Sequence, residues 1–125
     1  MAHILIAEDE EPLRNLVRRA LADAGHDVVA AADGAEALDL INRAKSRFDL
    51  LLADIKMPVM DGIALALAAA RDDPRLIILL MTGYADQRER AHGLDALIHE
   101  VIAKPFTVAE IRAAIASALA TEPRA

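Results

Sequence analysis

The sequence predicts an α/β fold built on a parallel sheet, because short aliphatic runs alternate with segments whose apolar residues recur at helical spacing. The five runs are residues 4–7, 27–31, 50–53, 76–81 and 101–103. Short apolar runs bounded by turn residues are typical of parallel strands buried on both faces. We therefore expect five parallel strands, joined by right-handed helical crossovers and covered by helices on both faces.

The first expected strand, residues 4–7, is followed by four acidic residues. Pro12 suits the first turn of a helix, and the acidic residues before it complement the helix dipole. Apolar residues then recur at helical spacing until Gly25, which ends this helix. Residues 27–31 form the second expected strand. Asp33 and Gly34 turn the chain into a second helix that runs through Ala44.

The run at residues 50–53 predicts a central buried strand that delivers Asp54 to the edge of the sheet. Met57 and Pro58 predict an exposed loop, because the residue before a proline favours extended backbone. The helix at residues 62–71 is predicted from propensity, since it has little polar face. Residues 76–81 form the fourth strand, which ends on Thr82.

The last part of the chain predicts two further helices and the fifth strand. Residues 85–92 are nearly all polar or charged, so we expect a weakly held helix there. The strand at residues 101–103 ends on Lys104 and Pro105. Thr107 and Glu110 form a capping box for the last helix.

Composition limits the classes of function. A length of 125 residues fits one domain, and a net charge of -6 with a pI near 5.1 disfavours binding to nucleic acid. Without cysteines there is no disulfide framework or thiolate metal site. No apolar run suits a signal peptide or a membrane span. We expect a soluble, cytoplasmic protein that binds neither nucleic acid nor membrane.

Four of the five strands end on polar residues that could form one site: Glu8 and Asp9, Asp54, Thr82, and Lys104. Parallel strands place these ends on one edge of the sheet, where α/β proteins bind ligands. Each residue also has a purely structural interpretation; for example, a strand-ending aspartate can cap the following turn. Five polar residues at the same edge favour a common function over separate structural roles.

The chemistry of this group predicts a magnesium site that handles phosphate. Carboxylates gathered without a counterion repel one another, so the cluster suits a hard cation, and Mg²⁺ takes one or two carboxylates together with phosphate oxygens. Lys104 and Thr82 could both contact phosphoryl oxygens. With the charge screened in this way, a carboxylate such as Asp54 can act as a nucleophile and form an aspartyl phosphate.

Five sequence motifs carry a family resemblance: residues 4–10, 33–38, 54–62, 81–84 and 104–106. In this order, over nearly the whole chain, they resemble the receiver domain of two-component response regulators. This resemblance implies a flavodoxin-like (βα)5 sheet of order 2-1-3-4-5. It also implies that a histidine kinase or histidine phosphotransferase phosphorylates Asp54.

The same resemblance assigns the other site residues. It implies that Asp9, Asp54 and the backbone carbonyl of Lys56 bind Mg²⁺, and that Glu8 acts through water. Thr82 and Lys104 would then bind the phosphoryl group. The Lys104–Pro105 peptide bond is implied to be cis.

Two positions depart from the family pattern. Glu8 stands where the family usually has aspartate, and its longer side chain could alter the metal geometry. Val101 stands where many receivers carry an aromatic switch residue, so the usual coupling of that residue to Thr82 cannot run unchanged. Tyr84 is a candidate replacement for the missing aromatic switch.

We expect a stand-alone receiver over residues 1–120, a short tail at 121–125 and no output domain. Its signal would leave through the helix at 85–92, the last strand and the last helix, which would bind a downstream protein. The segments at 81–85 and 94–99 most resemble the CpdR group, which implies control of the ClpXP protease.

Two alternative functions use the same site. One is a phosphorelay intermediate that passes phosphate from Asp54 to another protein. The other is an Mg²⁺-dependent hydrolase of the aspartyl-phosphate type. The hydrolase is disfavoured, because such enzymes typically need a general acid two residues after the nucleophile, where this chain has Lys56, and a cap domain.

Overall fold

Five parallel strands form one sheet in the computed structural model, which describes residues 2–43, 48–83, 93–94 and 96–120. The strand order is β2-β1-β3-β4-β5, as the family resemblance implies. The strands are β1 (His3–Ala7), β2 (Asp27–Ala31), β3 (Leu50–Asp54), β4 (Ile77–Thr82) and β5 (Glu100–Ala103). Since β1, β3 and β4 lie inside the sheet, their carboxyl ends lie side by side at its centre.

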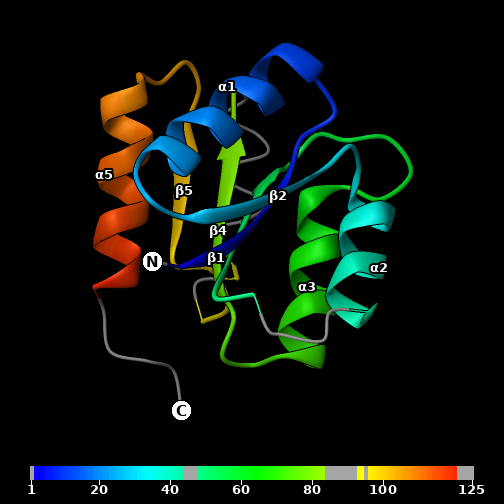
Figure 1. The fold of residues 1–125 in the computed structure, drawn as a ribbon. Coiled ribbons are helices and arrows are strands. Elements are labelled where there is room, and N and C mark those ends of the chain that lie inside the picture. Colours follow the sequence, from blue (N-terminus) through cyan, green and yellow to red (C-terminus); the bar gives the residue numbers. More distant parts are fainter. Residues whose placement is uncertain (1, 44–47, 84–92, 95, 121–125) are drawn as a thin grey trace.

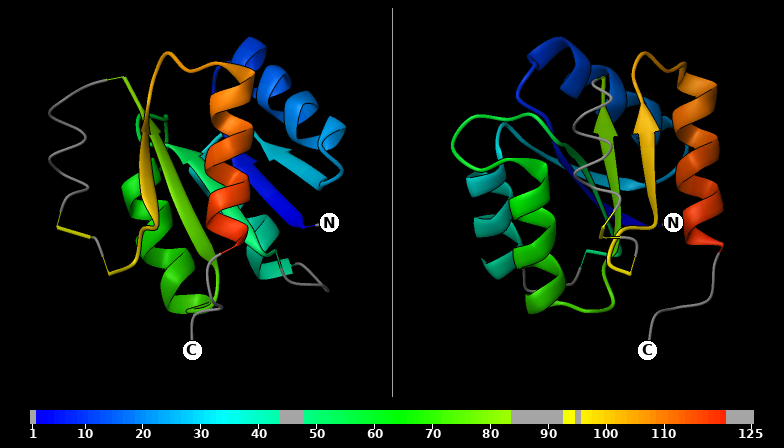
Figure 2. Two further views of the ribbon diagram at one scale, coloured as in Figure 1. Left: turned by 90° about the vertical axis from the view of Figure 1, so that its left-hand side faces the viewer. Right: turned by 180° about the vertical axis from the view of Figure 1, so that it is seen from behind.

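Helices cover both faces of the sheet (Figures 1 and 2). The described helices are α1 (Glu11–Asp23), α2 (Gly34–Arg43), α3 (Gly62–Asp72) and α5 (Val108–Leu119). Figure 1 shows α2 and α3 side by side on one face, while α1 and α5 lie on the other. Among the described residues, no helix is long and apolar enough to cross a membrane. The helix expected at 85–92, Tyr84 and the tail at 121–125 lie outside the described residues.

Alternate strand residues supply two separate hydrophobic cores, because successive side chains of a strand point to opposite faces. In β3, Leu51 and Ala53 pack toward α2 and α3, whereas Leu50 and Leu52 pack toward α1 and α5. All four side chains are fully buried. This two-sided burial explains why β3 appears in the sequence as a continuous apolar run.

Three of the four described helices begin with a side-chain cap. Asp33 accepts a hydrogen bond from the Glu36 amide, and Asp61 accepts one from the Ala64 amide, both at 2.8 Å. The capping box predicted for α5 is present. Helix α1 differs, because its N-cap residue, Glu10, makes no side-chain capping bond. The loop between β1 and α1 is held by other bonds, including one from the Glu8 amide to the Ala31 carbonyl at 3.1 Å.

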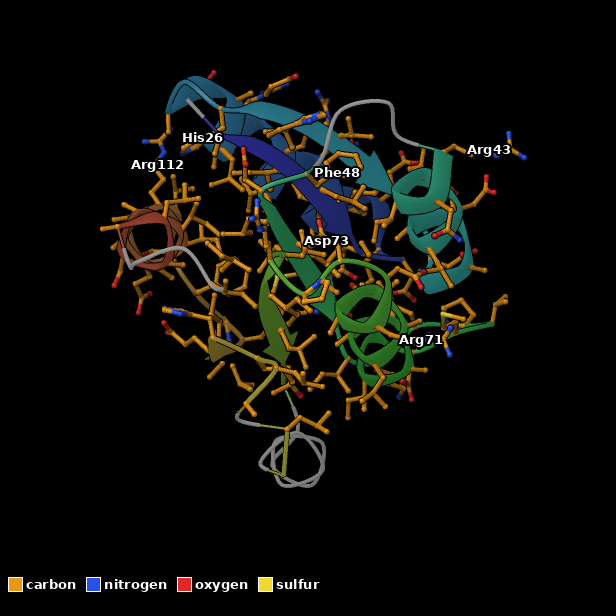
Figure 3. All side chains as sticks on the ribbon, turned by 90° about the horizontal axis from the view of Figure 1, so that it is seen from below. His26, Arg43, Phe48, Arg71, Asp73 and Arg112 are labelled. Atoms are coloured by element: carbon orange, nitrogen blue, oxygen red, sulfur yellow. The ribbon has the colours of Figure 1, made fainter. Side chains whose placement is uncertain are left out.

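The opposite edge of the sheet, seen from below in Figure 3, is held by hydrogen bonds between side chains and backbone. Arg112 of α5 donates from Nε to the Ala20 carbonyl of α1 at 2.9 Å. His26 accepts a hydrogen bond from the Ala2 amide at its Nδ1 atom, at 3.2 Å. These bonds tie the helices and strands together at the edge away from the polar cluster.

Two glycines let the loops at the carboxyl edge approach other backbone. A Cβ atom added at Gly62 would lie 2.3 Å from the Asp54 carbonyl oxygen, and one at Gly34 would lie 2.3 Å from the Met60 carbonyl oxygen. Both neighbours are backbone atoms that cannot turn away. The missing side chain of Gly62 therefore lets α3 begin directly against the end of β3.

We expect Gly62→Ala to lower the free energy of unfolding by about 1–3 kcal/mol, because the new methyl group displaces the backbone of Asp54. Urea denaturation measures this change. Gly93→Ala is the matched control, since a Cβ atom there meets nothing within 4 Å. Equal stability of the two variants would contradict the proposed steric requirement.

Candidate functional site at the carboxyl edge of the sheet

Three carboxylates from neighbouring strands meet at the carboxyl edge. Glu8 and Asp9 follow β1, and Asp54 is the last residue of β3. One carboxylate oxygen from each lies within 4.8 Å of the others. Glu8 and Asp54 are buried, whereas Asp9 is exposed. The parallel pairing of β1 with β3 thus converts two separate acidic sequences into one cluster.

Lys104 enters this cluster from the loop after β5. Its Nζ atom lies 3.0 Å from Oε1 of Glu8 and 3.0 Å from Oδ2 of Asp54. The second oxygen of Glu8 accepts a hydrogen bond from the Glu10 amide at 3.2 Å. A single ammonium group therefore bridges two buried carboxylates that would otherwise repel each other.

The pKa values of Glu8 and Lys104 reflect both their burial and this contact. Burial raises the pKa of Glu8 to about 7 from an ordinary value of 4.5, and the charge of Asp54 acts in the same direction. Hydrogen bonds from Glu10 and Lys104 lower the pKa of Glu8 but do not offset burial. Burial alone would lower the pKa of Lys104. Hydrogen bonds and charges from Asp54 and Glu8 outweigh that effect and raise it.

The loop between β3 and α3 is fixed at both ends by backbone hydrogen bonds. The Ile55 amide donates to the Met81 carbonyl, and the Gly62 amide donates to the Ile55 carbonyl, both at 2.9 Å. Within the loop, Val59 has a φ of 70°, which is uncommon for a β-branched residue. This constrained loop carries Lys56, which is exposed beside the carboxylates.

Thr82 and Lys104 belong to adjacent strand ends. Thr82 is the last residue of β4 and is buried. Its carbonyl oxygen accepts a hydrogen bond from the Lys104 amide at 2.8 Å. The Lys104–Pro105 peptide bond is cis, as the resemblance implied. Val101 of β5 is half-buried and packs against the core beneath α2 and α3.

A cavity of about 390 Å³ opens over the cluster, and its chemistry fits a hard cation together with an anionic group. Its lining residues are Asp9, Glu10, Asp54, Lys56, Gly83 and Lys104. The carboxylates supply the oxygen ligands that Mg²⁺ prefers, and the cavity leaves room for water or phosphate oxygens. Lysine ammonium groups are donors suited to an anion.

The structure brings together most of the residues that the sequence singled out. Glu8, Asp54 and Lys104 are in direct contact, and Asp9 and Lys56 line the same cavity. Asp54 is not the cap of the following helix, because Asp61 has that role. Tyr84 lies outside the described residues.

Sequence reasoning missed Arg14, whose guanidinium group contacts the backbone of the acidic loop. Its Nη1 atom lies 3.0 Å from the Glu8 carbonyl oxygen and 3.4 Å from that of Asp9. A signal was available, since a cation in the first turn of a helix opposes the helix dipole and so needs another partner. Backbone acceptors leave no pattern in the sequence, so the partner itself could not be predicted.

Comparison with known proteins identifies the family. The family model for the response regulator receiver domain matches residues 4–116. The chain belongs to the response regulator receiver domain family. The residues matched include the acidic cluster and all five strands except His3, the first residue of β1. Receiver domains are signalling domains of two-component systems, and this family assignment accounts for both the fold and the polar residues at the carboxyl edge.

Individual relatives agree with this assignment. Response regulator MprA from Mycobacterium sp. (strain KMS) is 37% identical over 110 residues, which cover 88% of this chain and 47% of the relative. The chain thus spans about half the length of the curated relatives that it matches, and its receiver fold corresponds to one part of such proteins.

Solved structures show the same fold. The chemotaxis response regulator CheY4 of Vibrio cholerae is 30% identical, with a TM-score of 0.84 over 94% of this chain and 98% of that chain. TrrA from Thermotoga maritima, solved in complex with Mg²⁺-BeF, is 27% identical, with a TM-score of 0.83 over 94% of this chain and 99% of that chain.

We expect the stability of the metal-free receiver to fall as pH rises from about 4.5 to about 7. In this window folded Glu8 keeps a proton that the unfolded chain has released, so unfolding is favoured by higher pH. Glu8→Gln removes this dependence, and its stability relative to the wild type should increase through the window. Urea denaturation in EDTA at several pH values measures the difference.

The matched control is Glu10→Gln, which removes an exposed carboxylate from the same loop. Its stability relative to the wild type should change little across this pH range. Parallel pH profiles for the wild type and Glu8→Gln would contradict the raised pKa of Glu8.

Proposed function

We propose that the protein is a phosphorylation-switched receiver in which Asp54 accepts a phosphoryl group from a histidine kinase or histidine phosphotransferase in an Mg²⁺-dependent reaction. The single observation that carries this proposal is the Lys104 ammonium group, 3.0 Å from both Asp54 and Glu8, beside a cavity large enough for a phosphoryl group. A carboxylate nucleophile, a movable cation and further carboxylates are the parts that this transfer requires.

We assign the metal ligands to Asp9, Asp54 and the backbone carbonyl of Lys56, with Glu8 acting through water. The assignment is supported by the grouping of the three carboxylates within 4.8 Å and by the position of Lys56 on the cavity wall. Both oxygens of Glu8 already have protein partners, which favours an indirect role for this residue. Bound Mg²⁺ supplies positive charge that screens the carboxylates and the phosphoryl oxygens.

In the transfer step, a carboxylate oxygen of Asp54 forms a bond to phosphorus while the bond from phosphorus to the donor histidine nitrogen breaks. The electron pair of the broken bond stays on the imidazole nitrogen. Lys104 already hydrogen-bonds to Asp54, so its ammonium group can follow the negative charge onto a phosphoryl oxygen. Thr82, at the end of the neighbouring strand, supplies a hydroxyl donor to another phosphoryl oxygen.

We expect incubation with acetyl phosphate and Mg²⁺ to add one phosphoryl group to the wild type and none to Asp54→Ala. Intact mass measures the adduct, which should be lost in base and absent when EDTA replaces Mg²⁺. Asp39→Ala is the control, because it removes an exposed carboxylate from α2, away from the cavity. An adduct on Asp54→Ala, or none on a wild type that binds Mg²⁺, would refute the proposal.

We further propose that phosphorylation alters a protein-binding surface formed by β5, α5 and the segment at 85–92. Within the described part, β5 and α5 border a cavity of about 470 Å³ that includes Val101, Phe106 and Ala113. Thr82 is directly paired with Ala103 of β5, so movement of Thr82 toward phosphate would reach this surface. As the downstream partner we propose the ClpXP protease, on the sequence resemblance to the CpdR group alone.

This proposal predicts that phosphorylation changes amide hydrogen exchange in β5 and in the first turns of α5. Hydrogen exchange with mass spectrometry, before and after treatment with acetyl phosphate, measures the effect. The amides of α2 serve as an internal control, because α2 lies on the other face of the sheet. Unchanged exchange in β5 and α5 of a fully phosphorylated sample would refute this surface.

A further inference from the structure

Arg14 of α1 contacts the backbone of the acidic loop, residues 8–10, which joins β1 to α1. Its Nη1 atom donates to the Glu8 carbonyl at 3.0 Å and lies 3.4 Å from the Asp9 carbonyl, while Nη2 lies 3.8 Å from the Glu11 carboxylate. Only 18% of the Arg14 side chain is exposed. One guanidinium group therefore contacts the backbone of both residues that bring carboxylates to the site from β1.

This contact differs from a helix cap, because the guanidinium group donates to carbonyls of the loop and does not accept from amides of the helix. The loop lies between the end of β1 at Ala7 and the start of α1 at Glu11, and α1 has no side-chain capping bond. The remaining local bonds run from the Glu8 amide to the Ala31 carbonyl and from the Glu10 amide to the Glu8 side chain. Arg14 therefore supplies a donor to the Asp9 carbonyl from outside the loop itself.

From this geometry we propose that Arg14 is a positioning residue for the magnesium site, holding Glu8 and Asp9 where their carboxylates can serve one cation. The inference rests on the proposed function, because it assumes that the cluster binds Mg²⁺. Arginine suits the role better than lysine, because its planar fork of donors can bridge two acceptors.

Whether removal of Arg14 weakens or tightens Mg²⁺ binding distinguishes a positioning role from a simple effect of its charge. Arg14 carries a positive charge near a cation site, so its removal should tighten Mg²⁺ binding if charge alone mattered. If Arg14 orients the acidic loop, its removal should weaken binding instead. Loss of a group that orients metal ligands typically weakens metal affinity by about tenfold or more.

The test compares Mg²⁺ affinity by isothermal titration calorimetry in the wild type, Arg14→Ala, Arg14→Lys and Arg18→Ala. Arg18 is the matched control, because it is an exposed arginine one turn further along α1. We expect a Kd about tenfold higher for Arg14→Ala, an intermediate Kd for Arg14→Lys and a wild-type Kd for Arg18→Ala. Phosphorylation of Arg14→Ala by acetyl phosphate should slow at low Mg²⁺ and recover at saturating Mg²⁺.

The outcomes separate this inference from the function on which it rests. Tighter or unchanged Mg²⁺ binding by folded Arg14→Ala, with a wild type that binds Mg²⁺ and is phosphorylated, overturns the positioning role alone. A wild type that does not bind Mg²⁺ overturns both proposals. If thermal unfolding shows that Arg14→Ala is not folded, Arg14→Lys becomes the test. An unchanged Kd for Mg²⁺ in Arg14→Lys overturns the proposal that the guanidinium group positions the loop.

Discussion

The contact between Lys104 and two buried carboxylates constrains the rest of the candidate site. Glu8 and Asp54 come from adjacent strands and lie too close to remain charged without compensation. One ammonium group 3.0 Å from each supplies that compensation, but it is shared. Burial nevertheless raises the pKa of Glu8 to about 7, because the bonds from Lys104 and Glu10 do not offset the loss of solvation.

The architecture around this contact holds Asp54 firmly in place but holds Lys104 less firmly. Two hydrophobic cores hold the centre of the sheet from both faces, and Gly62 allows α3 to begin against the end of β3. The position of Asp54 is therefore set by packing. Lys104, in contrast, reaches the cluster from the loop after the edge strand β5. Its ammonium group is carried by a long side chain that can change conformation more easily than Asp54 can.

Membership in the receiver family and the details of function are separate conclusions. The family follows from the match over residues 4–116 and from the shared fold. A fold hosts many functions, so partner and output depend on surfaces that differ among relatives. The family resemblance implies that Glu8 and Val101 depart from the usual receiver pattern. Glu8 is buried in the cluster, and Val101 is half-buried in β5, where it lines the cavity of the proposed partner surface.

The sequence by itself predicted five parallel strands, the capping box at Thr107 and the polar residues at the strand ends, and its family motifs implied the strand order. These features are local, because apolar periodicity, turn residues and family motifs can all be recognised within short segments. The structure added the shared contact of Lys104, the close approach at Gly62 and the hydrogen bonds of Arg14. Each depends on the distance between groups that only chain packing brings together, and backbone carbonyl acceptors have no signature in the sequence.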